Sequence, residues 1–245
     1  MRISRLLIPG PLEAGALITL EGEPSHYLKS VLRLRKGWRL SVFDGSGQEC
    51  LATVEAFGRD TTQLRLETPK HCDRESPLKI HLALGISRGE RMDFAIQKAV
   101  ELGANEITPL MTEFCVVRLD EERKANRHIH WQGIVRSACE QSGRNRLPIL
   151  HPPCALDDWL TARKAVQGGL ILDPEVDRSF GSVPAPQCGL TLLIGPEGGF
   201  SEREREGALM HEWTCVNLGP RVLRTETAVI AGLAACQALW GDFGG

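Results

Sequence analysis

An apolar strand runs directly into a glycine-rich turn in the segment Leu192-Leu193-Ile194-Gly195-Pro196-Glu197-Gly198-Gly199-Phe200-Ser201. The three glycines permit positive φ angles and let a ligand approach the main chain closely. Ser201, followed three residues later by Glu204, has the pattern of a capping box, which predicts that a helix begins there. Because ligands of open α/β sheets bind beyond the carboxyl ends of the strands, this turn is the first candidate site. An ordinary strand-to-helix turn is the alternative interpretation.

The turn does not have the residues of a phosphate-binding loop. The dinucleotide fingerprint G-x-G-x-x-G and the nucleotide-binding pattern G-x-x-x-x-G-K-[ST] are both absent. Glu197 would repel a phosphate group in the middle of the loop. The pattern therefore favours a ligand without phosphate, held by main-chain amides, and it would suit a ligand that carries positive charge.

A second strand and turn repeat this arrangement near the C-terminus. Val216-Asn217-Leu218 is predicted as a strand, and a loop bounded by glycine and proline, residues 219–224, follows it. Thr225 or Thr227 is predicted to cap a final helix that runs to Trp240 and is apolar nearly all round, which indicates burial. Two arginines and Glu226 flank this buried helix. They either pair with one another to fix the loop, or an arginine faces a polar substrate in a pocket.

Strands and helices alternate over the C-terminal two thirds of the chain, which predicts an α/β domain with a largely parallel sheet. The expected strands are residues 80–86, 107–111, 170–172, 190–194 and 215–218, and the expected helices include residues 91–102 and 128–142.

The N-terminal part has short strands at the spacing of a small barrel. Strands are expected at residues 16–20, 38–43, 49–57 and 61–67, with a helix at Pro24–Leu34 that Ser25 caps. A polar linker at residues 68–77 follows, so we place the domain boundary there: residues 1–73 form the barrel and residues 74–245 the α/β domain.

Composition excludes several classes of protein. Hydrophobic residues make up 42% of the 245 residues and charged residues 24%, with a net charge of −2, which is typical of globular proteins. The sequence has no signal-peptide pattern and no apolar run long enough for a membrane span, so we expect a cytoplasmic protein. The eight cysteines and seven histidines lack the spacing of zinc ligands, and no metal is expected.

Four segments in order resemble the ribosomal RNA small subunit methyltransferase E family, of the SPOUT class of S-adenosylmethionine-dependent RNA methyltransferases. Val31–Arg33 and Phe43–Gly45 in the N-terminal part also fit that family. The four segments are Ile86–Asp93, Glu140–Pro148, Leu193–Gly199 and Leu218–Ala228.

The resemblance implies properties that the residue patterns alone do not. It implies a trefoil-knotted α/β domain, where connection rules alone would give an unknotted doubly wound sheet. It implies an N-terminal PUA-like barrel that binds RNA, S-adenosylmethionine as the cofactor, and a homodimer. The implied reaction is methylation of N3 of a uridine in 16S ribosomal RNA, near its 3′ end, on free RNA or on the small ribosomal subunit.

The two turns and the end of the 170–172 strand supply the expected cofactor-binding residues. These are Leu172, Ile194, Gly195, Pro196, Glu197, Gly198, Gly199, Leu218, Gly219, Arg221, Val222, Leu223, Thr225, Thr227 and Ala228. Glu197 is the first candidate for a general base or a cofactor-orienting carboxylate. The alternative is that Glu197 caps the next helix or pairs with Arg221 or Arg224. Arg224 is the candidate for stabilising charge that develops on the uracil oxygens.

Arginines outside the two turns are the expected RNA contacts, because the guanidinium fork suits phosphate geometry. The set, in which Arg144-Asn145-Arg146 is the strongest member, comprises Arg2, Arg5, Arg33, Arg88, Arg91, Arg136, Arg144, Asn145 and Arg146. Rival functions are a small-molecule methyltransferase or nucleotide-binding transferase, a methyltransferase acting on another RNA, and a non-catalytic RNA-binding or ribosome-assembly protein.

Overall fold

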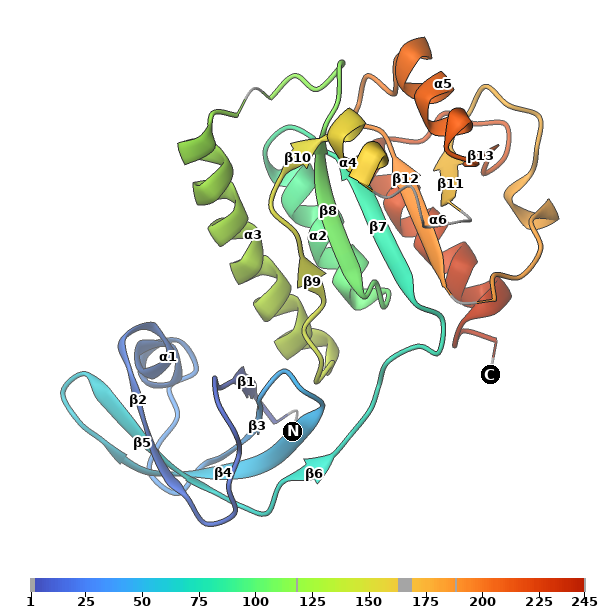
Figure 1. The fold of residues 1–245 in the computed structure, drawn as a ribbon. Helices are drawn as coiled ribbons and strands as arrows, with labels where there is room; N and C mark the ends of the chain where they lie inside the picture. Colours follow the sequence, from blue (N-terminus) through green and yellow to red (C-terminus); the bar gives the residue numbers. More distant parts are fainter. Residues whose placement is uncertain (1–2, 118, 163–168, 188, 245) are drawn as a thin grey trace. The chain divides into compact units, whose positions relative to one another are not determined.

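The computed structural model describes residues 3–117, 119–162, 169–187 and 189–244 (Figure 1). The chain divides into two compact units. One comprises residues 1–75 together with 139–147, and the other comprises residues 76–138 and 148–245. Arg2 lies outside the described residues. No helix among the described residues is both long enough and apolar enough to cross a membrane.

The first unit is built on a six-stranded sheet of order β1-β3-β4-β5-β2, with β6 paired to β4. Because β1 and β2 are the two ends of this order, the expected barrel is a half-barrel sheet. Its strands are β1 (Arg5–Leu7), β2 (Leu17–Glu21), β3 (Arg39–Phe43), β4 (Gln48–Phe57), β5 (Thr61–Leu66) and β6 (Lys70–His71).

The helix expected at Pro24–Leu34 is shorter and irregular, and the prediction that Ser25 caps it is wrong. Helix α1 (Gly22–His26) is capped at Glu21 without a side-chain bond and continues as a π-helical turn, η1 (Tyr27–Val31). The Ser25 hydroxyl is buried and bonds Thr62 Oγ1 on β5 at 2.7 Å. Ser25 therefore ties this helix to the sheet. Leu28, fully buried, fills the core of the half-barrel.

The second unit contains a seven-stranded sheet in which every described pairing is parallel, as predicted. Its order is β10-β8-β7-β12-β11-β13, with β9 on β8. The strands are β7 (Ile80–Gly85), β8 (Glu106–Met111), β9 (Ile149–Leu150), β10 (Cys154–Ala155), β11 (Gly169–Leu172), β12 (Leu190–Ile194) and β13 (Thr214–Val216).

Helices cover both faces of this sheet. Helices α4 (Leu156–Ala162) and α5 (Glu202–Met210) pack on one face, where Leu193 and Trp159 join one apolar cluster. Helices α2 (Glu90–Glu101) and α6 (Thr225–Trp240) pack against each other, and Gly232 of α6 lies against Leu192 and Leu172. Because successive side chains of a strand point to opposite faces, the apolar run of β12 is buried on both sides.

Helix α3 (Glu121–Ser142) begins seven residues before the predicted start at His128. Its first turns are polar and lack an apolar stripe, so periodicity gave no signal there. The carboxylate of Asp120 accepts a hydrogen bond from the Arg123 amide at 2.8 Å, which is the bond of an N-cap. The end of α3 and the loop that follows it belong to the first unit.

The carboxylate of Glu49, on β4, is buried and joins the loop after α3 to the rest of the first unit. It accepts hydrogen bonds from Arg5 at 2.8 Å, Arg74 at 3.1 Å and Asn145 at 3.1 Å. Burial alone would raise the pKa of Glu49, but the bonds from Arg74, Arg5 and Asn145 outweigh it and hold the pKa well below its ordinary value. Glu49 is therefore ionised and joins three separate segments of the chain.

Replacing Glu49 by Gln is expected to lower the free energy of unfolding by about 3 kcal/mol, because Arg5 would be left buried without a counter-charge. Chemical denaturation measures the loss. The matched control is Glu55→Gln on the same strand. Glu55 pairs with Arg65 while both side chains are substantially exposed, so its loss should cost less than about 1 kcal/mol. Equal effects of the two substitutions would contradict the assignment.

The same carboxylate predicts a loss of stability in acid. A carboxyl whose pKa is lower in the folded state stabilises the fold fully above the unfolded pKa, ordinarily 4.5, and the contribution declines as the pH falls below that value.

Candidate functional site

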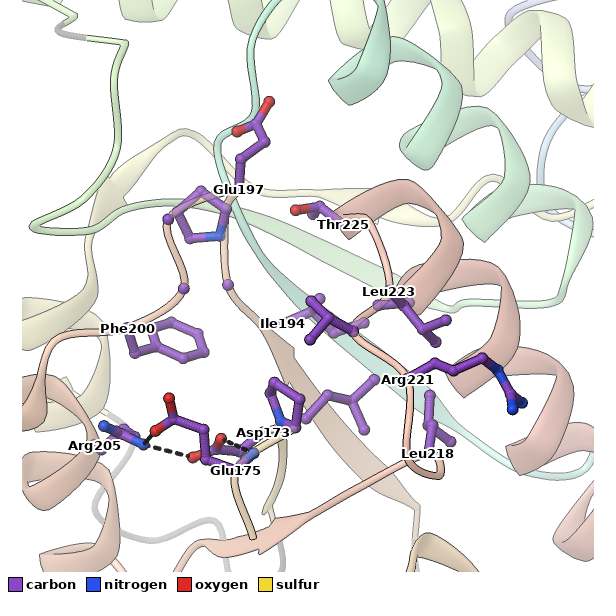
Figure 2. Close-up of a pocket in the computed structure, with 18 of the residues that line it drawn as sticks. Asp173, Glu175, Ile194, Glu197, Phe200, Arg205, Leu218, Arg221, Leu223 and Thr225 are labelled. Atoms are coloured by element: carbon purple, nitrogen blue, oxygen red, sulfur yellow. Dashed lines mark hydrogen bonds and ion pairs between the residues drawn. The ribbon is translucent and has the colours of Figure 1, made fainter.

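A pocket of about 400 Å³ lies beyond the carboxyl ends of β11, β12 and β13 (Figure 2). This volume is within the range of small-molecule sites. Every predicted cofactor-binding residue except Thr227 lines it. Thr227 is exposed, two helical positions after Thr225, and such positions do not share a helix face.

The β12 turn forms one wall of the pocket. Gly199 has a φ of +70°, and its amide donates to the Pro196 carbonyl at 2.9 Å, which closes a tight turn. The predicted capping box is confirmed, because the Glu204 amide bonds Ser201 Oγ and the Glu204 carboxylate bonds the Ser201 amide. A side chain at Gly85, at the end of β7, would meet Pro196 at 2.4 Å. The neighbouring strand thus leaves room for this turn only because it ends in glycine.

The loop between β13 and α6 forms the opposite wall. Gly219 has a φ of +102°, and its amide donates to Asn217 Oδ1 at 3.1 Å. The prediction that Thr225 or Thr227 caps α6 is wrong. Arg224 occupies the N-cap position in an extended conformation without a side-chain cap bond, and Thr225 is already helical and buried. Thr225 therefore contributes to the pocket wall.

A third wall, after β11, was only partly anticipated. Leu172 was the one residue predicted there, and the three residues that follow it, Asp173, Pro174 and Glu175, also line the pocket. Arg205 of α5 bonds the carboxylates of Asp173 at 3.1 Å and Glu175 at 2.8 Å (Figure 2). Phe200 and Arg205 are the other lining residues that the prediction missed. The sequence feature that could have predicted Asp173 and Glu175 is their position in a polar segment directly after a strand of the parallel sheet.

Glu197 has different partners from those the sequence suggested. Its Oε1 accepts hydrogen bonds from Arg91 Nη1 at 3.0 Å and from the Arg88 amide at 3.2 Å, and it pairs with neither Arg221 nor Arg224 in the part of the chain that is described. Burial alone would raise the pKa of Glu197, but hydrogen bonds from main-chain amides and from Arg91 lower it. The carboxylate is therefore ionised at neutral pH and is a weak base in this state.

Arg224, the other predicted catalytic residue, is exposed and is not among the residues that line the pocket. Its position at the start of α6 places its main chain next to Thr225, which does line the pocket. Its role toward a substrate stays a prediction.

The segment expected to be the strongest RNA contact is mostly buried, which corrects the expectation that it faces solvent. Arg144 and Asn145 are 5% and 1% exposed, and Arg144 forms an ion pair with buried Glu75. Arg5 bonds Glu49 and Asn145 and lies over the Phe43 ring. These residues were mistaken for surface because their partners are distant in sequence.

The other predicted RNA contacts are exposed. Arg33, Arg88 and Arg136 face solvent. Arg91 is half-exposed and paired with Glu197, and Arg146 is half-exposed near Asp73.

Comparison with known proteins agrees with this architecture. The RNA methyltransferase domain family matches residues 74–237, and the RNA methyltransferase PUA domain family matches residues 20–67. Fold and site together thus define an RNA methyltransferase domain of the SPOUT type joined to a PUA-like unit, the fold class that the resemblance implied.

Relatives that match almost the whole chain identify the family within this class. A ribosomal RNA small subunit methyltransferase E from Buchnera aphidicola is 36% identical over 241 residues, covering 98% of each chain. The chain belongs to the ribosomal RNA small subunit methyltransferase E family. The Neisseria gonorrhoeae family member, solved bound to S-adenosyl methionine, is 37% identical with a TM-score of 0.92, and the match covers 99% of this chain and 100% of that one. A Legionella pneumophila protein solved with the bound cofactor SAM is 41% identical with a TM-score of 0.95 over the same shares.

Proposed function

We propose that the protein transfers a methyl group from S-adenosylmethionine to N3 of a uridine in 16S ribosomal RNA, near the 3′ end. One observation carries the proposal: a pocket built from three main-chain turns in a chain of this family. The Neisseria gonorrhoeae relative, bound to S-adenosyl methionine, supports the cofactor. The position of the target base rests on the family resemblance.

The pocket suits this cofactor chemically. Apolar side chains of Leu172, Ile194 and Leu218 offer a surface for a flat base, and the main chain of the two glycine turns offers donors and acceptors for polar groups. Three carboxylates, Asp173, Glu175 and Glu197, line the walls together with two arginines, Arg205 and Arg221, so the lining has a small excess of negative charge. Such a lining accepts a ligand that has both a cationic centre and a carboxylate and carries no phosphate. S-adenosylmethionine, when bound, supplies an electrophilic methyl group on a sulfonium.

The protein's part in the reaction is to bind the two reactants and orient them toward each other. The acceptor nitrogen carries a proton at neutral pH, and in this proposal that proton passes to water when the nitrogen is methylated. The target base must leave its stack to reach the pocket. Rigid turns that hold two reactants in line supply much of the rate of such a reaction. Glu197, fixed by Arg91 and the Arg88 amide, acts as an orienting carboxylate in this proposal, and Arg224 stabilises charge on the uracil oxygens.

The same proposal includes the assembly and the location of the protein. It acts as a homodimer in the cytoplasm, as the family resemblance implies. Its RNA contacts are the exposed arginines. Residues 1–73 form the RNA-binding domain and residues 74–245 the methyltransferase domain, although residues 139–147 of the second range belong to the first compact unit.

Methyl transfer is tested with labelled S-adenosylmethionine and three acceptors: purified small subunits, free 16S RNA and small metabolites. We expect label in the small-subunit RNA, mapped by mass spectrometry to N3 of one uridine near the 3′ end. Label in metabolites alone would favour a small-molecule enzyme. Binding of S-adenosylhomocysteine without transfer to any acceptor would favour a non-catalytic RNA-binding protein.

Glu197→Gln separates an orienting carboxylate from a general base. Removing the charge weakens the bonds from Arg91 and the Arg88 amide that hold Glu197, so we expect the Kd for S-adenosylmethionine to rise about tenfold, equivalent to about 1.4 kcal/mol. Turnover at saturating cofactor should change less, because the lowered pKa makes Glu197 a weak base. Glu202→Gln, on the exposed side of α5, is the control. A loss of turnover of about 10²-fold or more with unchanged cofactor binding would restore the base role.

The exposed arginines predict a specific salt dependence. The logarithm of the RNA-binding constant falls linearly with the logarithm of the salt concentration. Each lost phosphate contact reduces the magnitude of that slope by about 0.9 for duplex and about 0.7 for single-stranded nucleic acid. Arg33→Gln combined with Arg136→Gln should therefore reduce the slope for RNA binding by between about 1.4 and 1.8. Arg123→Gln is the control, because this arginine is also exposed but already pairs with Asp120. An unchanged slope in the double variant would remove both residues from the RNA surface.

A further inference from the structure

Three side chains that are far apart in sequence meet near the amino ends of β7 and β8, away from the carboxyl ends where the cofactor pocket lies. His81 is the second residue of β7 and Glu106 the first of β8, and the two are paired in register. His151 follows β9, and its amide donates to the Ile107 carbonyl at 2.9 Å. Parallel register thus brings two imidazoles and one carboxylate together.

The distances among these groups allow one metal ion to contact all three. Glu106 Oε2 lies 2.9 Å from His151 Nε2 and 3.6 Å from His81 Nδ1. One ligand atom from each residue lies within 4.8 Å of those of the other two. Tetrahedral zinc, with bonds of about 2.0–2.2 Å, separates its ligand atoms by about 3.3 Å. The two measured separations lie on either side of that value.

The surroundings of His81 give a second, independent observation. Its other ring nitrogen, Nε2, is 2.7 Å from Thr108 Oγ1, and both residues are buried. A histidine that binds a metal through one nitrogen donates its other ring N–H to a fixed acceptor, which orients the ring. The His81 ring is also stacked on His151 and meets Trp159 edge-on. His81 is therefore held in one orientation before any ion binds.

We propose that His81, Glu106 and His151 bind one divalent transition-metal ion of the zinc class, with water as the fourth ligand. Two nitrogens and one carboxylate oxygen are a ligand set that zinc accepts. His151 and Glu106 are 38% and 40% exposed, so an ion reaches the site from solvent. The ion joins the ends of β7, β8 and β9, and it stabilises the folded chain because it binds only when these strands are assembled. The site is independent of the proposed methyl transfer.

The test uses tag-free protein, Zn²⁺ in competition with a chromophoric chelator, and Co²⁺ as a spectroscopic probe. We expect one ion per chain at micromolar concentration and a Co²⁺ spectrum without a thiolate charge-transfer band. At a hundredfold excess over Kd, Zn²⁺ should raise Tm by about 5 °C. His151→Ala and Glu106→Gln should each weaken binding about 10- to 100-fold and abolish the Tm shift.

His128→Ala is the matched control, because this ring bonds the Leu150 carbonyl, one residue before His151, and lies outside the cluster. It should bind Zn²⁺ as the native chain does. Thermal unfolding without metal verifies that each variant is folded. If either His151→Ala or Glu106→Gln does not fold, the other variant tests the proposal. Equal Zn²⁺ binding by His151→Ala and the native chain, a thiolate band, or no binding by the native chain would each overturn the proposal and leave a hydrogen-bonded His–Glu–His cluster.

Discussion

Parallel hydrogen bonding of β11 to both β12 and β13 is the constraint on which the site depends. Ile171 pairs with Leu193 on one side and with Cys215 on the other, so three strands end at the same edge. Each strand then continues into a turn, and the three turns enclose one pocket. Because β12 is buried on both faces, a slip of one residue would exchange its side chains between two close-packed layers, so packing on the two faces fixes this register.

Charged side chains have two roles in this chain: some join distant segments of the fold, and others line the pocket. Around Glu49 they hold together distant segments of the first unit, where Arg5, Arg74 and Asn145 meet one carboxylate. At the pocket walls, arginines hold carboxylates in place: Arg91 pairs with Glu197, and Arg205 pairs with Asp173 and Glu175. Sequence alone cannot separate these roles, because an arginine in a polar loop has the same local pattern whether it is buried against a carboxylate or exposed to RNA.

The predictions that succeeded were local ones. The capping box at Ser201, the five expected strands of the second unit and the glycine turn at Gly198-Gly199 all depend on residues within a few positions of one another. The predictions that failed depended on a distant partner. Ser25 bonds Thr62 instead of capping a helix, and Arg144 pairs with Glu75 instead of facing solvent.

The sequence by itself determined the alternation of strands and helices, the two glycine turns, and the family, because backbone preference and motif spacing are encoded by neighbouring residues. Only the tertiary structure decided that Asp173 and Glu175 complete the pocket with Arg205, that Arg91 holds Glu197, and that His81, Glu106 and His151 meet. The physical reason is strand order and register: they set which side chains become neighbours across the sheet, and no local pattern records that choice.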